Sequence, residues 1–418
     1  MKIHIDPVIA GRIKAAWANL SSAQQSRVAP MLARASHHAQ VVAATGQAPP
    51  LPADVPRQAL LIATALNDDK DQVMANLDRG IVVHVGVSGE IYGTGKYEEL
   101  DPGWAEAGAV WLEYFAKMKT KAPFVAAPET IKIADKVQIA IAGDWGTGNW
   151  RPHNPAPAAD VGRQMDFLKA DYTIHLGDTY YAGTDDQEQQ LLVTPWPNGA
   201  MTRRALTLNS NHEMYSGANG YFGIALKDDK FSLQKNCSYF ALQNDAWVIV
   251  GLDTAYYANE EKMYLDGALL APDDPQVQRD FLAEKIATGK KLLLLTHHGG
   301  LSLDGGSKTA LWNQVMGVFP SAPPPAGWYW GHEHAAVVYS SVATGRTLCR
   351  CCGHGAIPWG HAKVLEANPN VDWFESRPAN DPEIPLRVLN GFAMLSFDGP
   401  NLKETFYDEN GGVAWSLG

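Results

Sequence analysis

Apolar residues in the first third of the chain follow helical and hairpin patterns. In the Ala-rich segments at residues 8–32 and 56–77 they recur at helical spacing, and residues 81–97, IVVHVGVSGEIYGTGKY, then alternate as in a β-hairpin. Residues 121–130, KAPFVAAPET, combine prolines with small residues, which is typical of a linker. The pattern therefore predicts a small, mostly helical N-terminal domain over residues 1–125.

After residue 130 the pattern changes to short runs that are almost entirely apolar. Helical segments at residues 158–169 and 280–288 lie between these runs, which read VQIAIAG, YTIHLG, AWVIVGL, KKLLLLT and GWYWG. Such an alternation predicts an α/β domain over residues 131–418, with strands buried on both faces. In the final stretch, residues that face inward alternate with residues that face outward, and Asp398-Gly399 and Asn410-Gly411 are typical turn dipeptides. We therefore expect an antiparallel meander there.

Composition and charge narrow the classes of function. The chain has 418 residues, of which 46% are hydrophobic, enough for a large core. Its 45 acidic and 34 basic residues give a net charge of -11, and no Lys/Arg cluster could line a nucleic-acid groove. We therefore expect no nucleic-acid partner, and an anionic ligand would need local positive charge such as metal ions.

The sequence also bears on location. The N-terminus lacks an apolar segment of secretory type, and no run approaches the roughly 20 apolar residues of a membrane span. We therefore expect no membrane span and a cytoplasmic protein, with an exported form left open.

Two short motifs have structural explanations. GTGK, at residues 93–96, resembles part of a phosphate-binding loop, but Glu90 replaces the first glycine and Tyr97 stands where Ser or Thr belongs, so we predict a turn. A zinc site would need a second cysteine pair at ligand spacing, and the sequence has none. We therefore predict reduced thiols in or near a strand at Cys349, Cys351 and Cys352, with Cys237 apart from them.

Chemically active side chains follow five strand-like segments, namely VQIAIAG, YTIHLG, KKLLLLT and GWYWG from the runs above and LTLNS at residues 206–210. These side chains are Asp144; Asp178 with Tyr181; Asn211, His212 and Glu213; His297 and His298; and His332 and His334. Ligand sites of α/β folds lie at the carboxyl ends of strands. An Asp after a Gly is commonly a turn residue, and an isolated His is commonly structural. The five motifs taken in order, however, predict a metal site.

The series GDWG, GDTYY, NHE, THH and GHEH resembles the five-motif pattern of the calcineurin-like metallophosphoesterases, and specifically the purple acid phosphatase branch. In the wider superfamily the first motif usually supplies a His where this chain has Gly146, and the second motif gains a tyrosine, here Tyr181, in the purple branch. The resemblance begins near residue 137 and leaves out the first 120 or so residues. It implies a four-layer α-β-β-α sandwich.

The resemblance also implies a binuclear metal centre. The first metal would be held by Asp144, Tyr181 and His334, the second by Asn211, His297 and His332, and Asp178 would bridge them. Three anionic oxygens around one ion suit Fe(III), and imidazoles with an amide suit a divalent Fe, Zn or Mn ion. A phenolate on Fe(III) predicts a visible colour, whereas a reducing compartment leaves a Mn or di-iron(II) form open. Ser210 replaces a usual glycine, which should leave ligation intact.

The activity that the resemblance implies is hydrolysis of a small-molecule phosphate ester, most simply a phosphomonoester. A bridging or terminal hydroxide at the metals would attack phosphorus in line with the leaving oxygen. His212 would protonate that oxygen or stabilise the transition state, and Glu213 would either orient it or serve as a helix-start or salt-bridge residue. Alternatives are a phosphodiesterase acting on cyclic nucleotides or other diesters, and a non-catalytic scaffold whose N-terminal domain binds a partner.

Other residues near these motifs have two interpretations each. His298 could replace His297 as the ligand, or contact substrate. His354 could touch substrate or belong to a structural loop, and Trp145 could wall the pocket or pack beneath its loop. The natural substrate, the metals, the oligomeric state and the role of the N-terminal domain stay open at this level.

Overall fold

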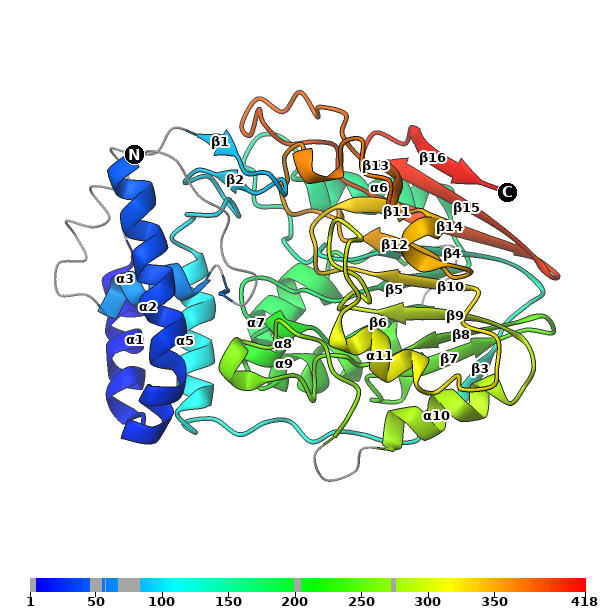
Figure 1. Ribbon diagram of the computed structural model, residues 1–418, viewed down its shortest axis with the longest axis horizontal. Coiled ribbons are helices and arrows are strands. Elements are labelled where there is room, and N and C mark those ends of the chain that lie inside the picture. Colours follow the sequence, from blue (N-terminus) through cyan, green and yellow to red (C-terminus); the bar gives the residue numbers. More distant parts are fainter. Residues whose placement is uncertain (1–4, 46–54, 57, 67–82, 199–203, 272–275) are drawn as a thin grey trace.

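The computed structural model describes residues 5–45, 55–56, 58–66, 83–198, 204–271 and 276–418. Two sheets stack against each other, and a group of N-terminal helices stands at one end of the molecule (Figure 1). In spatial order the larger sheet contains β13 (Val371–Phe374), β11 (Ala336–Tyr339), β12 (Leu348–Cys352), β10 (Gly327–Trp330), β9 (Lys291–Thr296), β8 (Trp247–Gly251), β7 (Phe240–Gln243) and β3 (Thr130–Lys132).

The smaller sheet combines a parallel and an antiparallel half. In spatial order it contains β16 (Val413–Leu417), β15 (Asn401–Asp408), β14 (Gly391–Asp398), β4 (Lys136–Ala142), β5 (Tyr172–His175) and β6 (Ala205–Thr207). The strands β4, β5 and β6 are parallel, whereas β14, β15 and β16 form the predicted antiparallel meander. The five strands read from apolar runs are all present.

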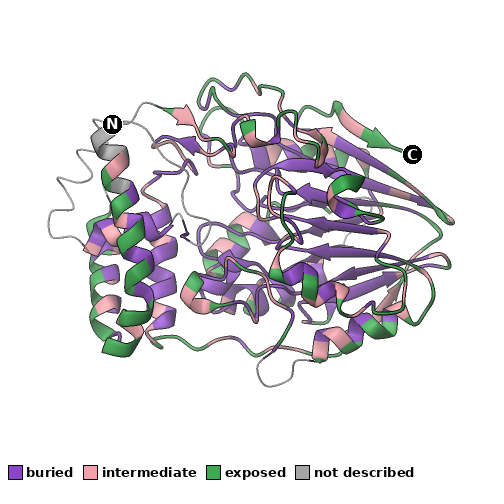
Figure 2. Cartoon of the chain, in the orientation of Figure 1, coloured by how far each residue is buried: buried purple, intermediate pink, exposed green. Residues whose placement is uncertain are grey.

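Helices cover the outer faces of both sheets, so the predicted α-β-β-α layering is confirmed. Residues of both sheets, such as Ile141 on β4 and Leu295 on β9, share one apolar core between them. On the outside of the larger sheet pack α10 (Val277–Ile286) and α11 (Ala310–Met316), and on the outside of the smaller sheet packs α6 (Pro157–Leu168). The central strands β4, β5, β8, β9 and β10 are buried along most of their length (Figure 2).

The N-terminal region is mostly helical, as predicted, and carries the short hairpin. Its elements are α1 (Pro7–Asn19), α2 (Ser22–Thr45), α3 (Gln58–Leu66), β1 (His84–Val85), β2 (Ile91–Tyr92) and α5 (Trp104–Phe115). The Asp6 carboxylate caps α1 by accepting the Val8 backbone N–H at 2.7 Å. The predicted helical segment beyond residue 66 and the first two residues of the predicted hairpin lie outside the described residues.

The N-terminal helices share an apolar cluster with the smaller sheet. Buried side chains of α5, among them Trp104 and Trp111, belong to the same cluster as Met165 on α6 and Met394 on β14. Residues 116–129, which join the two parts of the chain, form neither helix nor strand, whereas Thr130, the last residue of the predicted linker, begins β3. The N-terminal region therefore packs on the rest of the molecule through continuous apolar contact.

Short helical segments fill the connections. They are α7 (Asp185–Gln187), α8 (Asn211–Tyr215), α9 (Asn219–Gly223), α12 (Ser341–Thr344), and the 3-10 and π turns η1 (Glu188–Val193), η2 (Ala225–Lys227), η3 (Asp229–Gln234), η4 (Glu260–Lys262) and η5 (Lys363–Leu365). Among the helices described, none combines the length and the apolar character needed to cross a bilayer.

The two structural explanations of short motifs are confirmed. Residues 93–96 form turns and bends, and the Gly95 backbone N–H donates to the Glu98 carboxylate at 2.7 Å, where a phosphate loop would hold its ligand. The four cysteines are free and buried, three of them on β12.

Candidate metal centre

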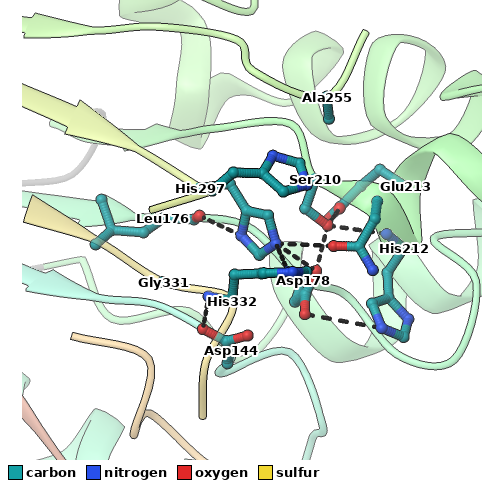
Figure 3. A network of polar contacts seen from close by, with 12 residues as sticks. Asp144, Leu176, Asp178, Ser210, His212, Glu213, Ala255, His297, Gly331 and His332 are labelled. Carbon is teal, nitrogen blue, oxygen red and sulfur yellow. Dashed lines mark hydrogen bonds and ion pairs between the residues drawn. The ribbon is translucent and has the colours of Figure 1, made fainter. Parts of the chain in front are cut away.

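The predicted site residues come together where the carboxyl ends of strands from both sheets meet. Asp144 follows β4, Asp178 follows β5, and Asn211 follows β6 at the start of α8, while His297 follows β9 and His332 follows β10. Their side chains converge in one polar cluster (Figure 3). This convergence is a consequence of topology, because the parallel strands of each sheet end at the same edge.

The backbone at four of these residues is left-handed. The φ angles are 57° at Asp144, 80° at Asp178, 71° at His332 and 48° at His334. Residues other than glycine adopt this backbone conformation rarely, and each such residue costs of order 1–3 kcal/mol. Backbone strain of this kind concentrates at binding and catalytic sites, where the surrounding structure holds it in place. Its presence at four predicted ligands supports a functional role for these loops.

One group of ligand atoms gathers around Asp144. The Nε2 atom of His334 lies 3.4 Å from Asp144 Oδ1. The phenol oxygen of Tyr180 lies 3.1 Å from that same His334 nitrogen and 3.3 Å from Asp144 Oδ1. It also donates to Asp178 Oδ2 at 2.8 Å. Two carboxylates, a phenol and an imidazole therefore face one another.

The structure corrects the tyrosine predicted for this group. Tyr180 points at the cluster, whereas the Tyr181 hydroxyl donates to the Asp101 carboxylate in the N-terminal region. Both tyrosines lie in the turn that follows Asp178, and there the Tyr180 side chain faces the ligands while the Tyr181 side chain faces the N-terminal region. The motif GDTYY did indicate a tyrosine ligand. The spacing from Asp178, however, favoured Tyr181, whose side chain points away from the group.

A second group gathers around His297. Its Nε2 atom lies 2.9 Å from Asn211 Oδ1, 3.2 Å from His332 Nδ1 and 3.3 Å from Asp178 Oδ1. The Asn211 amide nitrogen donates to the Tyr215 hydroxyl at 3.0 Å, which directs its oxygen at the group. The other nitrogen of His297 lies 2.9 Å from the Leu176 carbonyl, and donation there leaves the Nε2 lone pair free for a metal.

Asp178 lies between the two groups. Its Oδ2 contacts Tyr180 and its Oδ1 contacts His297, so each carboxylate oxygen faces a different set of ligands. This is the arrangement that a carboxylate bridging two cations requires. The ligand atoms of Asp144, Asp178 and His297 all lie within 4.8 Å of one another.

The protonation states fit a pair of cations. Burial raises the pKa of Asp144, and the nearby charge of Asp178 raises it further. Two buried carboxylates in contact are costly unless protons or cations neutralise them. Burial also lowers the pKa values of His297 and His332, so both rings are neutral near pH 7, as metal ligation requires. The oxygens of the group around Asp144 suit a hard cation. The imidazoles of His297 and His332, together with the Asn211 amide, suit a divalent cation.

His298, the alternative ligand, is held by the protein at both ring nitrogens. Its Nδ1 lies 2.9 Å from the Thr254 hydroxyl and its Nε2 lies 2.8 Å from the Tyr264 carbonyl. Since a carbonyl only accepts, Nε2 carries the proton and Nδ1 accepts from Thr254. His298 still lies close enough to His297 and His332 to form a possible three-histidine group. The geometry favours His297 as the ligand and places His298 in the wall of the adjoining cavity.

His212 faces the cluster from the first turn of α8. Its Nδ1 lies 2.7 Å from the Tyr181 carbonyl, and its Nε2 lies 3.8 Å from Asp178 Oδ2 (Figure 3). Donation from Nδ1 to the carbonyl fixes the ring orientation and turns Nε2 toward the ligands. His212 also lines the adjoining cavity, as the predicted proton donor should.

Glu213 is fully buried behind the cluster and contacts it through Ser210. Hydrogen bonds connect the Ser210 hydroxyl to the carboxyl groups of Asp178 and Glu213, and the same oxygen accepts the His212 backbone N–H at 3.0 Å. A hydroxyl has one proton, so one carboxyl must supply the second. Burial, with the charge of Asp178, raises the pKa of Glu213 to about 8, so Glu213 holds that proton. Sequence reasoning treated Ser210 as a neutral replacement and missed this link.

Two other predicted contacts do not reach the cluster. Trp145 is 1% exposed and packs edge to face on Trp196, with ring centroids 4.9 Å apart. The ring of His354 lies 5.9 Å from that of Phe406 on β15. Both are absent from the described lining of the cavity beside the cluster.

That cavity has a volume of about 450 Å³ and is bounded by both parts of the chain. Asn211, His332 and His334 line it from the sheet edge, and Trp104 and Glu99 line it from the N-terminal region. No sequence pattern pointed to these two N-terminal residues, because nothing local relates them to motifs whose first ligand, Asp144, lies 40 or more positions further along the chain. The Trp104 ring lies 5.7 Å from those of Tyr180 and His212.

Comparisons with known proteins return similarities of structure alone. No protein-family model matches the chain, and the search of curated proteins found no match. Among solved structures, it is similar to GAP50, described as the anchor in the inner membrane complex of Plasmodium, with 14% identity, a TM-score of 0.46, and coverage of 68% of this chain and 88% of that one.

The chain is also similar to two further solved structures. A dimetal phosphatase from Danio rerio has 12% identity and a TM-score of 0.37, with coverage of 65% of this chain and 95% of that one. A conserved protein described as a predicted phosphoesterase, from Streptococcus pneumoniae, has 12% identity and a TM-score of 0.28, with coverage of 68% and 97%. We therefore base the assignment of function on the geometry of the site.

Proposed function

We propose that this protein hydrolyses phosphate esters, most simply small-molecule phosphomonoesters, at a binuclear metal centre of the purple acid phosphatase type. The observation that carries the proposal is the position of Asp178, whose two oxygens face two separate groups of ligand atoms. In this proposal Asp144, Tyr180 and His334 hold Fe(III), and Asn211, His297 and His332 hold a divalent Fe, Zn or Mn ion.

The two cations would supply a water of lowered pKa and neutralise the phosphate oxygens. The chain's own residues account for orientation and proton delivery. The Tyr181 carbonyl holds the His212 ring, and His212 lines the cavity next to the ligands. A protonated His212 is thus placed to give its Nε2 proton to the departing oxygen. Glu213 and Ser210 hold Asp178 in place from behind.

The shape of the cavity favours a compact ester. The N-terminal region bounds it on one side with Trp104, and the resulting volume of about 450 Å³ suits a small molecule rather than a polymer. This is our reason for preferring a monoester over a larger diester.

The test begins with the purified protein, whose metal content and visible spectrum are measured before one preparation is assayed on p-nitrophenyl phosphate and bis-p-nitrophenyl phosphate. We expect two metals per chain, a phenolate-to-iron absorption band and monoester hydrolysis. Mn-dependent diester hydrolysis without colour would favour the phosphodiesterase alternative. Absence of both metal and turnover after reconstitution would favour the non-catalytic scaffold.

Two variants separate ligation from catalysis. Asp178→Ala should lose both metals and activity, because it removes the carboxylate shared by the two ligand groups. His212→Ala should retain two metals per chain while kcat falls by about 10²- to 10⁴-fold, the usual contribution of a positioned general acid. Equal metal loss in the two variants would contradict the role proposed for His212.

A further inference from the structure

Tyr181 connects the N-terminal region to His212. Its hydroxyl donates to the Asp101 carboxylate, and its backbone carbonyl lies 2.7 Å from His212 Nδ1. Both side chains are buried, Tyr181 at 6% and Asp101 at 7% exposure. A residue that precedes the linker is thus joined through Tyr181 to the candidate proton donor.

Asp101 is built to hold this hydroxyl in one position. Its carboxylate also accepts the backbone N–H of Tyr97 at 2.8 Å and that of Gly103 at 2.9 Å. With two N–H donors fixing the carboxylate, its oxygen presents a rigid acceptor to Tyr181. An added Cβ at Gly103 would lie 2.4 Å from the Tyr181 hydroxyl, which shows how closely the two segments pack.

Aromatic packing holds the same assembly from the side. The Trp104 ring lies 4.9 Å from the Tyr181 ring and 5.7 Å from the His212 ring. Its indole N–H donates to the Glu98 carbonyl at 2.8 Å, so the ring cannot turn freely. The Lys96 ammonium lies 4.5 Å from the centre of the Tyr181 ring.

We propose that Asp101 and Tyr181 are positioning residues for His212: the N-terminal region, through Asp101, fixes the side chain of Tyr181, and the Tyr181 carbonyl in turn fixes the imidazole. The N-terminal region is therefore part of the catalytic apparatus and not an independent appendage. This inference rests on the proposed function insofar as it concerns the rate of hydrolysis, whereas the coupling between the residues exists without it.

The kinetic test uses three variants. Tyr181→Phe removes only the hydroxyl, Asp101→Ala removes the acceptor, and Asp101→Asn keeps an oxygen in nearly the same place as a conservative rescue. We expect Tyr181→Phe and Asp101→Ala to lower kcat by about tenfold to a hundredfold with KM little changed, since small displacements of catalytic groups have effects of that size. Metal content should stay at two per chain, and Asp101→Asn should recover most of the loss.

Tyr97→Phe is a matched control. Tyr97 is as buried as Tyr181, belongs to the same aromatic group, and donates its hydroxyl to the Thr147 carbonyl at 3.0 Å instead of to Asp101. Loss of the Tyr97 hydroxyl should destabilise the fold about as much as loss of the Tyr181 hydroxyl does. The kcat of Tyr97→Phe should nevertheless stay near that of wild type. If Tyr97→Phe lowers kcat as much as Tyr181→Phe does, the effect is one of general packing and the proposal is overturned.

A second readout does not depend on activity. In metal-free protein labelled with ¹⁵N-histidine, the His212 ring signals, assigned through His212→Asn, should shift in Tyr181→Phe and Asp101→Ala but not in Tyr97→Phe. Should wild type hydrolyse no phosphate ester, the proposed function fails, and the ring signals alone decide the positioning role. Unchanged His212 signals in both variants would overturn this inference even in an active enzyme.

Discussion

At the scale of single residues, the direction of each side chain decides its role. Tyr180 and Tyr181 are neighbours of identical chemistry, yet one faces the ligand groups and the other faces Asp101. His297 and His298 divide in the same way: the first presents a free nitrogen to Asn211, whereas both nitrogens of the second are engaged by Thr254 and Tyr264.

This division predicts different spectra for two conservative variants. Tyr180→Phe should abolish the phenolate-to-iron absorption and weaken binding of the first metal, because it removes the oxygen that lies between Asp144 and His334. Tyr181→Phe should keep the band and the metal. Visible spectra and metal analysis of the two iron-loaded proteins check this. A band lost only in Tyr181→Phe would restore the assignment made from the spacing of the motif.

At the scale of elements, one buried ion pair joins the two sheets. Arg350 on β12 in the larger sheet donates to Glu404 on β15 in the smaller sheet through two hydrogen bonds, at 2.8 and 3.1 Å. The side chains are 2% and 1% exposed. The cost of removing both charges from water offsets much of their attraction, so the pair fixes how the sheets stack more than it stabilises them.

Breaking this pair on one side should therefore cost more than replacing it. We expect Glu404→Leu to lower the free energy of unfolding by about 3–5 kcal/mol, because the Arg350 charge is left buried without its partner. The double variant Arg350→Met with Glu404→Leu should recover most of that loss. Urea denaturation of the three proteins measures the difference. A double variant no more stable than Glu404→Leu would show that the apolar pair does not fit between the sheets.

At the scale of the whole molecule, burial extends to titratable groups outside the cluster. His354 lies within the core, and burial lowers its pKa to about 3 from an ordinary value near 6.5. In the unfolded chain the same histidine takes up a proton as the pH falls through about 6.5, while the folded chain resists until about pH 3. Its contribution to stability is therefore lost progressively across that window.

Replacing His354 by a residue that does not titrate should weaken the dependence of the unfolding free energy on pH. Between about pH 6 and pH 3, His354→Leu should reduce the acid slope of the unfolding free energy by up to about 1.4 kcal/mol per pH unit relative to wild type. Denaturant unfolding of the metal-free proteins at several pH values gives both slopes. Parallel curves for the two proteins would mean that His354 is protonated in the folded state.

Some features of this protein follow from the sequence by itself. The apolar runs determined the strands, because a strand buried on both faces has little choice of residue type. The polar residues after these runs located the candidate site, because parallel strands end at a common edge. Together they were enough to predict an α/β domain and to place Asp144, Asp178, Asn211, His297, His332 and His334 near one another. The four α-β-β-α layers were expected from the resemblance of the five motifs to the metallophosphoesterases.

Only the tertiary structure decided the remaining features. The choice of Tyr180 over Tyr181 depends on the direction of adjacent side chains within one loop. Three further features depend on contacts that no local sequence pattern predicts. They are the hydrogen bonds of Ser210 to Asp178 and Glu213, the connection from Asp101 through Tyr181 to His212, and the position of Trp104 in the cavity lining. Asp101 and Tyr181 lie 80 positions apart in the chain, and their meeting follows from how the N-terminal helices pack on the smaller sheet, which hydrophobic periodicity does not encode.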